Sequence, residues 1–284
     1  MAGVLVLTLA GVLWCAGARA ACPDAARIAA LARAWEQKAP VRGWPAEMAI
    51  EDGLCARELF VRELARTQGR IVGYKAGLTN RAVQQRFGHA SPVRGVLFEK
   101  MLLPDGAEVP ARFGARPVFE ADLLVEVKDG AIHNARTPLE ALGLIARVIP
   151  FIELPDLMIA EGEPVNGALI AAINVGARLG VVGRGIDVAP TAEFADALAR
   201  MRVVVADHSG KDLARGEGAA ILGHPLNAAI WLAQDLALAD VRLKAGDLLS
   251  LGAFTPPLPP TPGTTITVRY EGLPGDPVVS VRFR

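Results

Sequence analysis

The stretch PVFEADLLVEV, residues 117–127, carries acidic side chains inside a run that is otherwise typical of a β-strand. Side chains along a strand point alternately to its two faces, so Glu120 and Asp122 share one face and their apolar neighbours share the other. The two carboxylates are then about 7 Å apart and point the same way. Either that face meets water and the acids keep it soluble, or a cation lies over it.

A third acidic residue stands in an unusual environment. The run RVIPFIELP, residues 147–155, places Glu153 among apolar neighbours, where an ionised carboxylate is costly unless something compensates its charge. A divalent cation would compensate Glu120, Asp122 and Glu153 together, and three hard oxygen ligands suit Mg²⁺ or Mn²⁺ better than zinc. The pattern leaves open the alternative of an exposed strand face and a separate, salt-bridged Glu153.

Lys75 is the next candidate for chemistry, in the segment GYKAGLT, residues 73–79. Glycines on both sides let the backbone approach a ligand closely. A lysine there can neutralise an anionic substrate or, with a lowered pKa, act as an acid or base. The alternative is a glycine-rich strand end with a solvated lysine.

The segment GEGAAILGHPLN, residues 216–227, leads small residues into a predicted helix. The free N–H groups at such a helix start can receive a substrate carboxylate. The same pattern is also typical of a close-packed loop and a helix cap. A single Gly-x-Gly without the surrounding Rossmann spacing is weak evidence for a nucleotide site.

Composition indicates a globular protein and argues against nucleic-acid binding. The chain has 284 residues, is 52% hydrophobic, and balances 30 Lys and Arg against 30 Asp and Glu. It has no basic run and few aromatic residues on which bases could stack, so no nucleic-acid partner is expected. A chain of this length can bury one good core or two small ones.

Residues 1–20 form an almost uncharged apolar run that ends in a small-x-small motif, and this pattern predicts a signal peptide. The mature protein would then be periplasmic or secreted, with no stable membrane span after cleavage. The alternatives are a buried or membrane-anchoring helix, with a cytoplasmic location if the segment is not a signal, or a lipid anchor on Cys22. Cleavage would leave Cys22 and Cys55, and an oxidising compartment would allow them to form a disulfide.

The remaining pattern predicts a helical N-terminal portion over residues 21–68 and a β-rich body over residues 69–284. Thr137 and Pro138 should open a helix that continues through Ile145 and ends before Pro150. A second helix is expected in the body at residues 225–239, and strands at 70–75, 202–206, 264–270 and 278–283. We therefore expect an α+β protein.

Four segments, read in order, resemble one family: GYKAGLTN, PVFEADLLVEV, FIEL and GEGAAILGHPLNAAIWLA. Together they are similar to the 2-hydroxypenta-2,4-dienoate hydratases (2-keto-4-pentenoate hydratases) and the related 4-oxalocrotonate decarboxylases of the fumarylacetoacetate hydrolase superfamily. The resemblance runs from about Glu47 to the C-terminus. It implies a fumarylacetoacetate-hydrolase-like mixed β-roll or barrel, with the small helical portion in front of it, and a homo-oligomer.

The resemblance also implies roles for individual residues. The family's metal ligands fall on Glu120, Asp122 and Glu153, with Asp122 one methylene shorter than the usual Glu, and its active-site lysine falls on Lys75. Magnesium or manganese is the implied cofactor. The substrate-binding residues implied by the first and last segments are Tyr74, Leu78, Gly223, His224 and Pro225.

The implied activity is a carbon–oxygen lyase that hydrates a 2-hydroxy-2,4-dienoate or 2-oxo-enoate to a 4-hydroxy-2-oxo acid, with the metal stabilising an enolate. Two departures affect the exact reaction. Relatives carry an Asp in an Asp-Phe-Gly-like segment where this chain has Val93-Arg94-Gly95, and an Asp-Asn-Ala-Ser-like segment where it has Ile173-Asn174-Val175-Gly176. Arg94 could instead pair with a second substrate carboxylate. A decarboxylase or C–C hydrolase of a related oxo acid, and a non-catalytic exported binder of metal and 2-oxo acid, are the alternatives.

Overall fold

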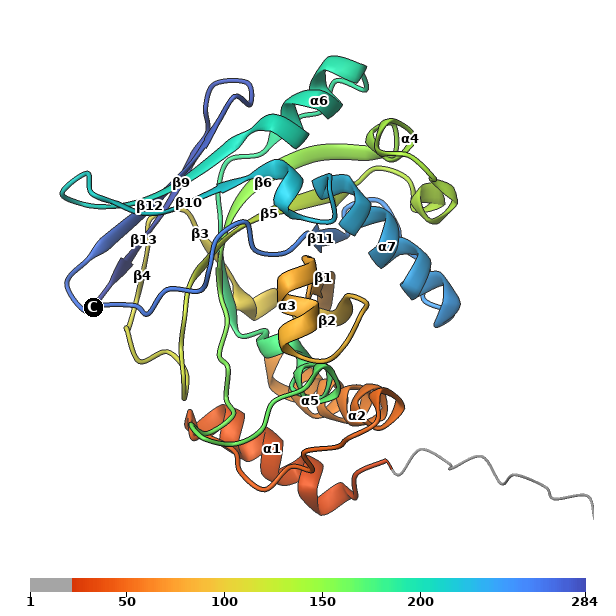
Figure 1. Ribbon diagram of the computed structural model, residues 1–284, viewed down its shortest axis with the longest axis vertical. Coiled ribbons are helices and arrows are strands. Elements are labelled where there is room, and N and C mark those ends of the chain that lie inside the picture. Colours follow the sequence, from red (N-terminus) through yellow and green to blue (C-terminus); the bar gives the residue numbers. More distant parts are fainter. Residues whose placement is uncertain (1–21) are drawn as a thin grey trace, which may run out of the picture.

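The computed structural model of the protein describes residues 22–284, and the signal peptide predicted for residues 1–20 lies outside the described residues (Figure 1). The α-helices are α1 (Ala25–Gln37), α2 (Ile50–Gln68), α3 (Arg81–Arg86), α4 (Pro138–Leu142), α5 (Gly167–Ala172), α6 (Ala192–Arg200) and α7 (Pro225–Leu238). The strands are β1 (Ile71–Gly77), β2 (Val93–Phe98), β3 (Leu102–Pro104), β4 (Ala107–Val109), β5 (Glu120–Val127), β6 (Ile145–Leu154), β7 (Leu179–Val182), β8 (Ile186–Asp187), β9 (Arg202–Asp207), β10 (Asp212–Glu217), β11 (Leu248–Ser250), β12 (Thr265–Glu271) and β13 (Val278–Phe283). Across this part of the chain, no helix has the length and apolar character needed to span a membrane.

The strands form two mixed sheets. The larger sheet has the order β2-β1-β11-β5-β6-β7-β3, with β8 paired to β6, and the smaller has the order β10-β9-β12-β13-β4. Parallel and antiparallel pairs occur in both, for example β1 with β11 and β1 with β2. In Figure 1 the long strands β5 and β6 curl from the larger sheet toward the smaller one, with α4, α6 and α7 along one side. This is the predicted α+β class with a strongly bent sheet.

The N-terminal helices pack onto the larger sheet. Asp24 caps α1 by accepting a 2.7 Å hydrogen bond from the Arg27 N–H. The buried side chains of α1 and α2 share one core with β2 and β6, including Leu31, Phe60 and Phe98. Figure 1 shows α1, α2 and α5 grouped at one end of the molecule. The helical portion therefore extends the core of the sheet.

A disulfide ties the first described residue to α2. Cys22 and Cys55 are bonded, with their Cα atoms 5.5 Å apart. This Cα separation is typical of disulfides. The bond fixes the start of the described chain to a helix that packs against the sheet.

The predicted helix from Pro138 is shorter than expected. Thr137 caps it by accepting a hydrogen bond from the Glu140 N–H, but α4 ends at Leu142 and Ile145 already begins β6. Pro150 does not mark the end of a helix, because it lies inside β6 opposite Leu123 of β5. The prediction was wrong here, because the apolar and β-branched residues of this ten-residue strand gain more from pairing with β5 than from extending a short helix.

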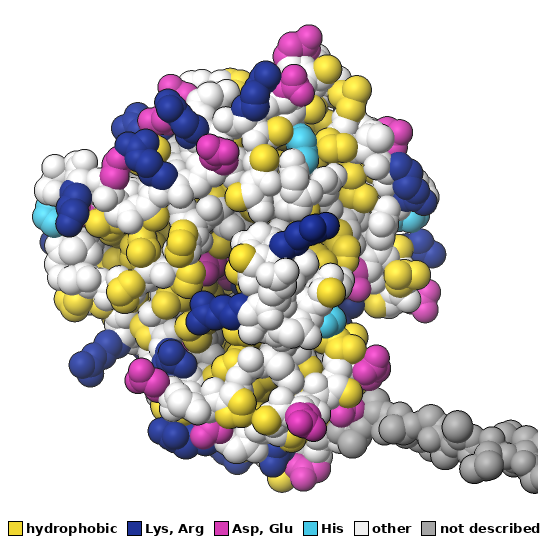
Figure 2. Space-filling view, in the orientation of Figure 1, with side chains coloured by type: hydrophobic (Ala, Val, Ile, Leu, Met, Phe, Trp, Pro, Cys, Tyr) yellow, Lys and Arg dark blue, Asp and Glu magenta, His cyan; other side chains and the backbone are white. Residues whose placement is uncertain are grey.

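Strand β5 is buried on both faces. Leu123 and Val125 belong to the core shared with α7 and the smaller sheet, whereas Leu124 belongs to the core shared with α1 and α2. The acids of β5 therefore do not lie on a solvated strand face. Figure 2 shows charged side chains of both signs interspersed over the visible surface.

Candidate active site

The three acidic residues identified in the sequence lie on one face of the β5–β6 pair. The register sets Glu120 directly opposite Glu153, and Asp122 opposite Phe151. Directly opposed residues in an antiparallel pair, and residues two apart on one strand, point to the same face. Asp122 is 0% exposed and Glu153 3% exposed, and Glu120 is half-buried. Asp122 and Glu153 are therefore interior groups, and Glu120 is partly exposed.

Strand β1 brings Lys75 to these acids. Its ammonium forms an ion pair with Glu153 and donates a 2.9 Å hydrogen bond to the Val175 carbonyl. Gly95 of β2 stands opposite Lys75, and a Cβ there would lie 2.9 Å from Lys75 Cγ and 2.8 Å from the Asn174 oxygen. The lysine side chain is 4% exposed. Glycine at position 95 therefore makes room for Lys75.

The Asp122 carboxylate is held by the end of β11. Its Oδ2 accepts a 2.5 Å hydrogen bond from the Ser250 hydroxyl. Its Oδ1 accepts hydrogen bonds from the backbone N–H groups of Leu251, at 3.2 Å, and Gly252, at 3.0 Å. These contacts fix the direction of the carboxylate.

Tyr270 of the smaller sheet joins the two acid-bearing strands. Its hydroxyl donates to the Asp122 main-chain carbonyl and accepts a 3.2 Å hydrogen bond from the Phe151 N–H. Burial raises the pKa of Tyr270 above its usual range, so the hydroxyl stays protonated. The smaller sheet thereby fixes the spacing of β5 and β6 at the site.

The three acids, if all were ionised, would carry more negative charge than the one lysine balances. Burial, with the nearby Glu153 charge, raises the pKa of Glu120 to about 8. Burial and Glu153 likewise raise the pKa of Asp122 to about 7, against the opposing effect of the Ser250 hydrogen bond. Three carboxylates thus face a single ammonium in a desolvated space, and an added cation would stabilise their ionised forms.

The donor set suits a hard divalent cation, although the side chains do not converge as a formed metal site. Within residues 22–284, no group of three or more His, Cys, Asp or Glu side chains has a metal-holding arrangement. Two of the acids are engaged by other groups: the Asp122 carboxylate points to β11, and the Glu153 carboxylate forms an ion pair with Lys75. The oxygen donors and the excess negative charge fit Mg²⁺ or Mn²⁺, and Glu153 would have to exchange its lysine for the ion.

No family model matches the chain. Individual relatives do. The chain is 31% identical to a 2-keto-4-pentenoate hydratase of Paraburkholderia phymatum over 210 residues, which cover 72% of this chain and 76% of that protein. It is 30% identical to a 4-oxalocrotonate decarboxylase of Pseudomonas putida over 237 residues, covering 84% and 86%.

The chain belongs to the 2-keto-4-pentenoate hydratase and 4-oxalocrotonate decarboxylase family. The solved structure of 4-oxalocrotonate decarboxylase from Pseudomonas putida G7, complexed with magnesium and adipate, matches it with a TM-score of 0.77 and 28% identity, covering 92% of this chain and 99% of that one. A fumarylpyruvate hydrolase from Pseudomonas aeruginosa shares the fold at a TM-score of 0.54 and 14% identity, covering 74% and 88%. The family and fold predicted from the four segments are confirmed.

Not all the substrate-binding residues that the family resemblance implies lie near Lys75 in the structure. Tyr74 precedes Lys75 on β1 and therefore points to the opposite face of the sheet, which it shares with Arg94 of β2. Arg94 itself pairs with Asp235 of α7 at 2.6 Å. Neither residue faces the acids, so Arg94 is not placed to bind a second carboxylate of a substrate held at Lys75.

Leu78 and Gly223 lie beyond the end of β1. Leu78 is buried in a left-handed backbone conformation (φ 56°), and its carbonyl accepts a 2.9 Å hydrogen bond from Gln84 Nε2. Gly223 lines a cavity of about 530 Å³ between α3 and the loop before α7, together with Asn80 and Arg81. This cavity adjoins the strand end that carries Lys75.

His224 and Pro225 have structural roles at the start of α7. Nδ1 of His224 accepts the Leu226 N–H at 3.1 Å, and Nε2 lies 3.0 Å from the Ala195 carbonyl, to which it donates. Both ring nitrogens are thus occupied within the protein, and burial lowers the pKa of His224. Pro225 is the first, buried residue of the helix. The cap that the sequence left open as an alternative is the arrangement observed.

The sequence identified residues 173–176 only as a departure from the family and did not predict that they form the turn that receives Lys75. Asn174 and Val175 both have left-handed backbone conformations, with φ 55° and 54°, which is unusual for a β-branched residue. The buried Asn174 side chain accepts the Val96 N–H at 2.7 Å and donates to the Val96 carbonyl at 3.0 Å. This pairing with β2 holds the turn and aims the Val175 carbonyl at Lys75. Only a polar Asn within an apolar run could have signalled it.

Proposed function

We propose that this protein is a metal-dependent hydratase that adds water to a 2-hydroxy-2,4-dienoate or 2-oxo-enoate and gives a 4-hydroxy-2-oxo acid. The observation that carries the proposal is the placement of Glu120, Asp122 and Glu153 on one face of the β5–β6 pair, with Glu153 paired to the ammonium of Lys75. Relatives named 2-keto-4-pentenoate hydratase at about 30% identity over most of the chain support it.

Glu120, Asp122 and Glu153 would hold the divalent cation, Mg²⁺ or Mn²⁺. The bound ion supplies a Lewis acid that favours the enolate of a 2-oxo acid. A magnesium complex of a 28% identical decarboxylase supports this choice of cofactor. Ser250 and the backbone of Leu251 orient the Asp122 carboxylate, so its direction is set before any ligand enters.

Lys75 would hold or move a proton at Nζ. Its ammonium is buried, is anchored by the Val175 carbonyl, and lies against Glu153. If the Glu153 carboxylate left Lys75, the Val175 carbonyl would remain as the one fixed partner of Nζ. The other N–H bonds of Nζ would then be free to reach a substrate oxygen or carbon. The neighbouring side chains of Val93 and Val175 are apolar and cannot carry a proton. We therefore assign proton transfer on this side of the site to Lys75.

The decarboxylase is the second candidate, because the magnesium-bound relative that covers 92% of this chain has that activity in its name. A non-catalytic binder of metal and 2-oxo acid is the third. The purified protein with Mg²⁺ or Mn²⁺ is incubated with freshly generated 2-hydroxypenta-2,4-dienoate. Loss of the conjugated absorbance with formation of the 4-hydroxy-2-oxo acid supports the hydratase. Carbon dioxide release from an oxalocrotonate indicates the decarboxylase, and binding without product indicates the binder.

We also infer an oxidising location and a homo-oligomer. The Cys22–Cys55 bond supports a periplasmic or secreted protein, since such bonds persist outside the reducing cytosol. The homo-oligomer is the assembly that the family resemblance implies. Mass measurement of the purified protein, and light scattering after gel filtration, test the two inferences.

A further inference from the structure

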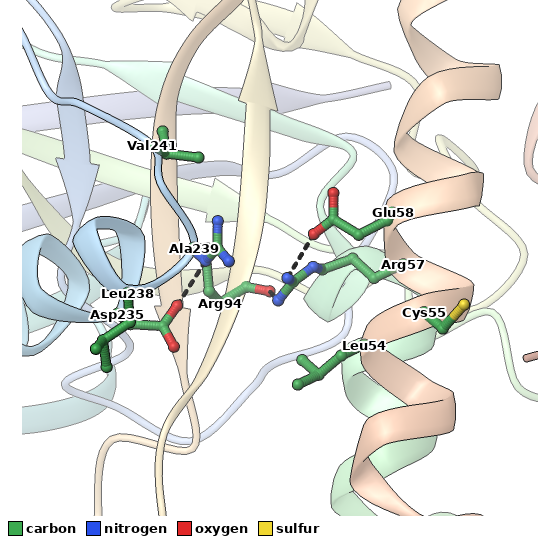
Figure 3. A pocket seen from close by; sticks show the side chains of 9 residues that line it. All are labelled: Leu54, Cys55, Arg57, Glu58, Arg94, Asp235, Leu238, Ala239 and Val241. Atoms are coloured by element: carbon green, nitrogen blue, oxygen red, sulfur yellow. Dashed lines mark hydrogen bonds and ion pairs between the residues drawn. The ribbon is translucent and has the colours of Figure 1, made fainter. Parts of the chain in front are cut away.

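A cavity of about 510 Å³ lies on the far side of β1 and β2 from Lys75, between α2 and the C-terminal end of α7. Figure 3 shows Arg57 reaching from α2 toward β2, with Arg94 between it and Asp235 of α7. The volume is in the range of small-molecule sites. The mechanism assigned to Lys75 and the acids uses none of these residues.

Two buried guanidinium groups form one side of this cavity. The side chains of Arg57 and Arg94 are 4% and 7% exposed. Arg57 Nη1 donates to the Arg94 carbonyl at 3.1 Å and Nη2 donates to Glu58 at 2.6 Å, while its buried Nε has no partner among the described residues. Burial and the charge of Arg94 lower the pKa of Arg57, so a nearby anion would stabilise the pair.

Arg94 keeps hydrogen-bonding capacity for a ligand. In the described part of the chain it donates only through Nε, to Asp235 at 2.6 Å. Its two terminal nitrogens form the fork that binds a carboxylate through parallel hydrogen bonds. The partner acids, Glu58 and Asp235, are 55% and 36% exposed and so neutralise the guanidiniums less than buried acids would.

A second part of the cavity wall is apolar. Leu54, Leu238, Ala239 and Val241 line it, and Leu238 is 88% exposed, the most exposed large hydrophobic residue in the described chain. A ligand with a hydrophobic body would cover this leucine and reduce its contact with water.

We propose that this cavity is a second ligand site, which binds a small organic carboxylate with its carboxylate on Arg94 and its apolar body against Leu54, Leu238 and Val241. The site lies behind the strand that carries Lys75 and does not depend on the proposed reaction. Free phosphate or acetate would meet the arginines but not the apolar wall, so both should bind more weakly.

Benzoate binding to metal-free protein tests the proposal, because no divalent ion is then present at the acids near Lys75 to bind a second benzoate. We expect saturable binding of benzoate by calorimetry, with the neutral isostere benzamide and the small anion acetate each weaker by roughly tenfold. Ala239→Phe fills the cavity without removing a polar group, and it should weaken benzoate binding roughly tenfold or more. Ala192→Phe, at an exposed position of α6, is the matched control and should bind benzoate as the unsubstituted protein does.

Arg94→Met gives an independent check on the charge. It should abolish the preference for benzoate over benzamide while circular dichroism and the benzamide affinity stay unchanged. Equal benzoate affinity in Ala239→Phe and the unsubstituted protein, equal affinity for benzoate and benzamide, or no saturable binding up to about 10 mM would each overturn the proposal.

Discussion

Without metal, the protein should lose stability as the pH rises from 5 to 8. The carboxyl groups of Glu120 and Asp122 have folded-state pKa values of about 8 and about 7, well above those of exposed carboxyl groups. The native state therefore keeps protons that the unfolded chain has released. The stability that this proton binding gives is fully present below the unfolded pKa, near 4, and is lost as the pH rises through the folded values.

The size of the effect follows from the number of protons retained. Between pH 5 and 7, each proton held only by the native state lowers the free energy of unfolding by about 1.4 kcal/mol per pH unit. His224 acts in the opposite direction, because its lowered pKa means that the unfolded chain binds the extra proton below about pH 6.5. The decline should therefore be steepest between pH 6.5 and 7.

Urea unfolding of metal-free protein at pH 5, 6, 7 and 8 measures this slope. Glu120→Gln should flatten it, whereas Glu126→Gln should leave it unchanged, since Glu126 lies on the same strand but pairs with the half-exposed Arg147 at the other end. Saturating Mg²⁺ should stabilise the protein more at pH 8 than at pH 5, because it binds the deprotonated acids. A flat slope in the metal-free protein, or the same slope in Glu120→Gln, would show that these two acids do not keep their protons in the native state.

Three further changes have defined outcomes. Lys75→Met should reduce turnover of the dienoate by about a hundredfold or more through loss of the proton carrier, and Lys75→Arg should be no better because arginine does not give up its proton. Metal affinity, measured by calorimetry, should not fall in either variant. Turnover by Lys75→Met above a tenth of the original would contradict this role. Tyr270→Phe should lower the free energy of unfolding by about 1–3 kcal/mol, since the Asp122 carbonyl loses its buried donor, and a loss below about 0.5 kcal/mol in urea unfolding would argue against the bridge. Reduction of the Cys22–Cys55 bond should lower stability by about 2–4 kcal/mol, and Cys55→Ser should make the protein insensitive to reductant; unchanged stability on reduction would contradict the tie.

The sequence predicted a strand within residues 117–127, where β5 starts at Glu120, and placed Glu120 and Asp122 on one face of it, but it did not show whether that face was solvated. Alternation reports which residues share a face, whereas burial depends on the elements that cover it. Here α1 and α2 cover one side of β5 and α7 with the smaller sheet covers the other. Those contacts join segments far apart in the chain.

The end of the helix at Pro138 shows the limit of local signals. The capping Thr137 and the proline after it correctly predicted where α4 starts. Pro150 was wrongly predicted to end a helix, because its role is set by its strand partner Leu123, which lies 27 residues earlier in the sequence. The carbonyl of Pro150 still accepts a 2.8 Å hydrogen bond from the Gly183 N–H, so the strand loses only one donor at that point.

For the site, residue types were easier to predict than directions. Lys75 and Glu153 could be chosen as charged residues in apolar or glycine-rich runs, but their ion pair depends on how β1 and β6 lie in one sheet. His224 shows the converse, since the Gly-His-Pro sequence before α7 suits a ligand or a cap equally well. Its two hydrogen bonds, to Leu226 and Ala195, assign the cap.

Calorimetric titration of the metal-free protein with Mn²⁺ and Mg²⁺ shows whether Glu120, Asp122 and Glu153 accept a divalent cation beside Lys75. We predict saturable binding with proton release near pH 7, weakened at least tenfold by Glu153→Gln, about 1.4 kcal/mol or more, and unchanged by Glu126→Gln. Equal affinity in the unsubstituted protein and Glu153→Gln, or no binding by the unsubstituted protein, would contradict it.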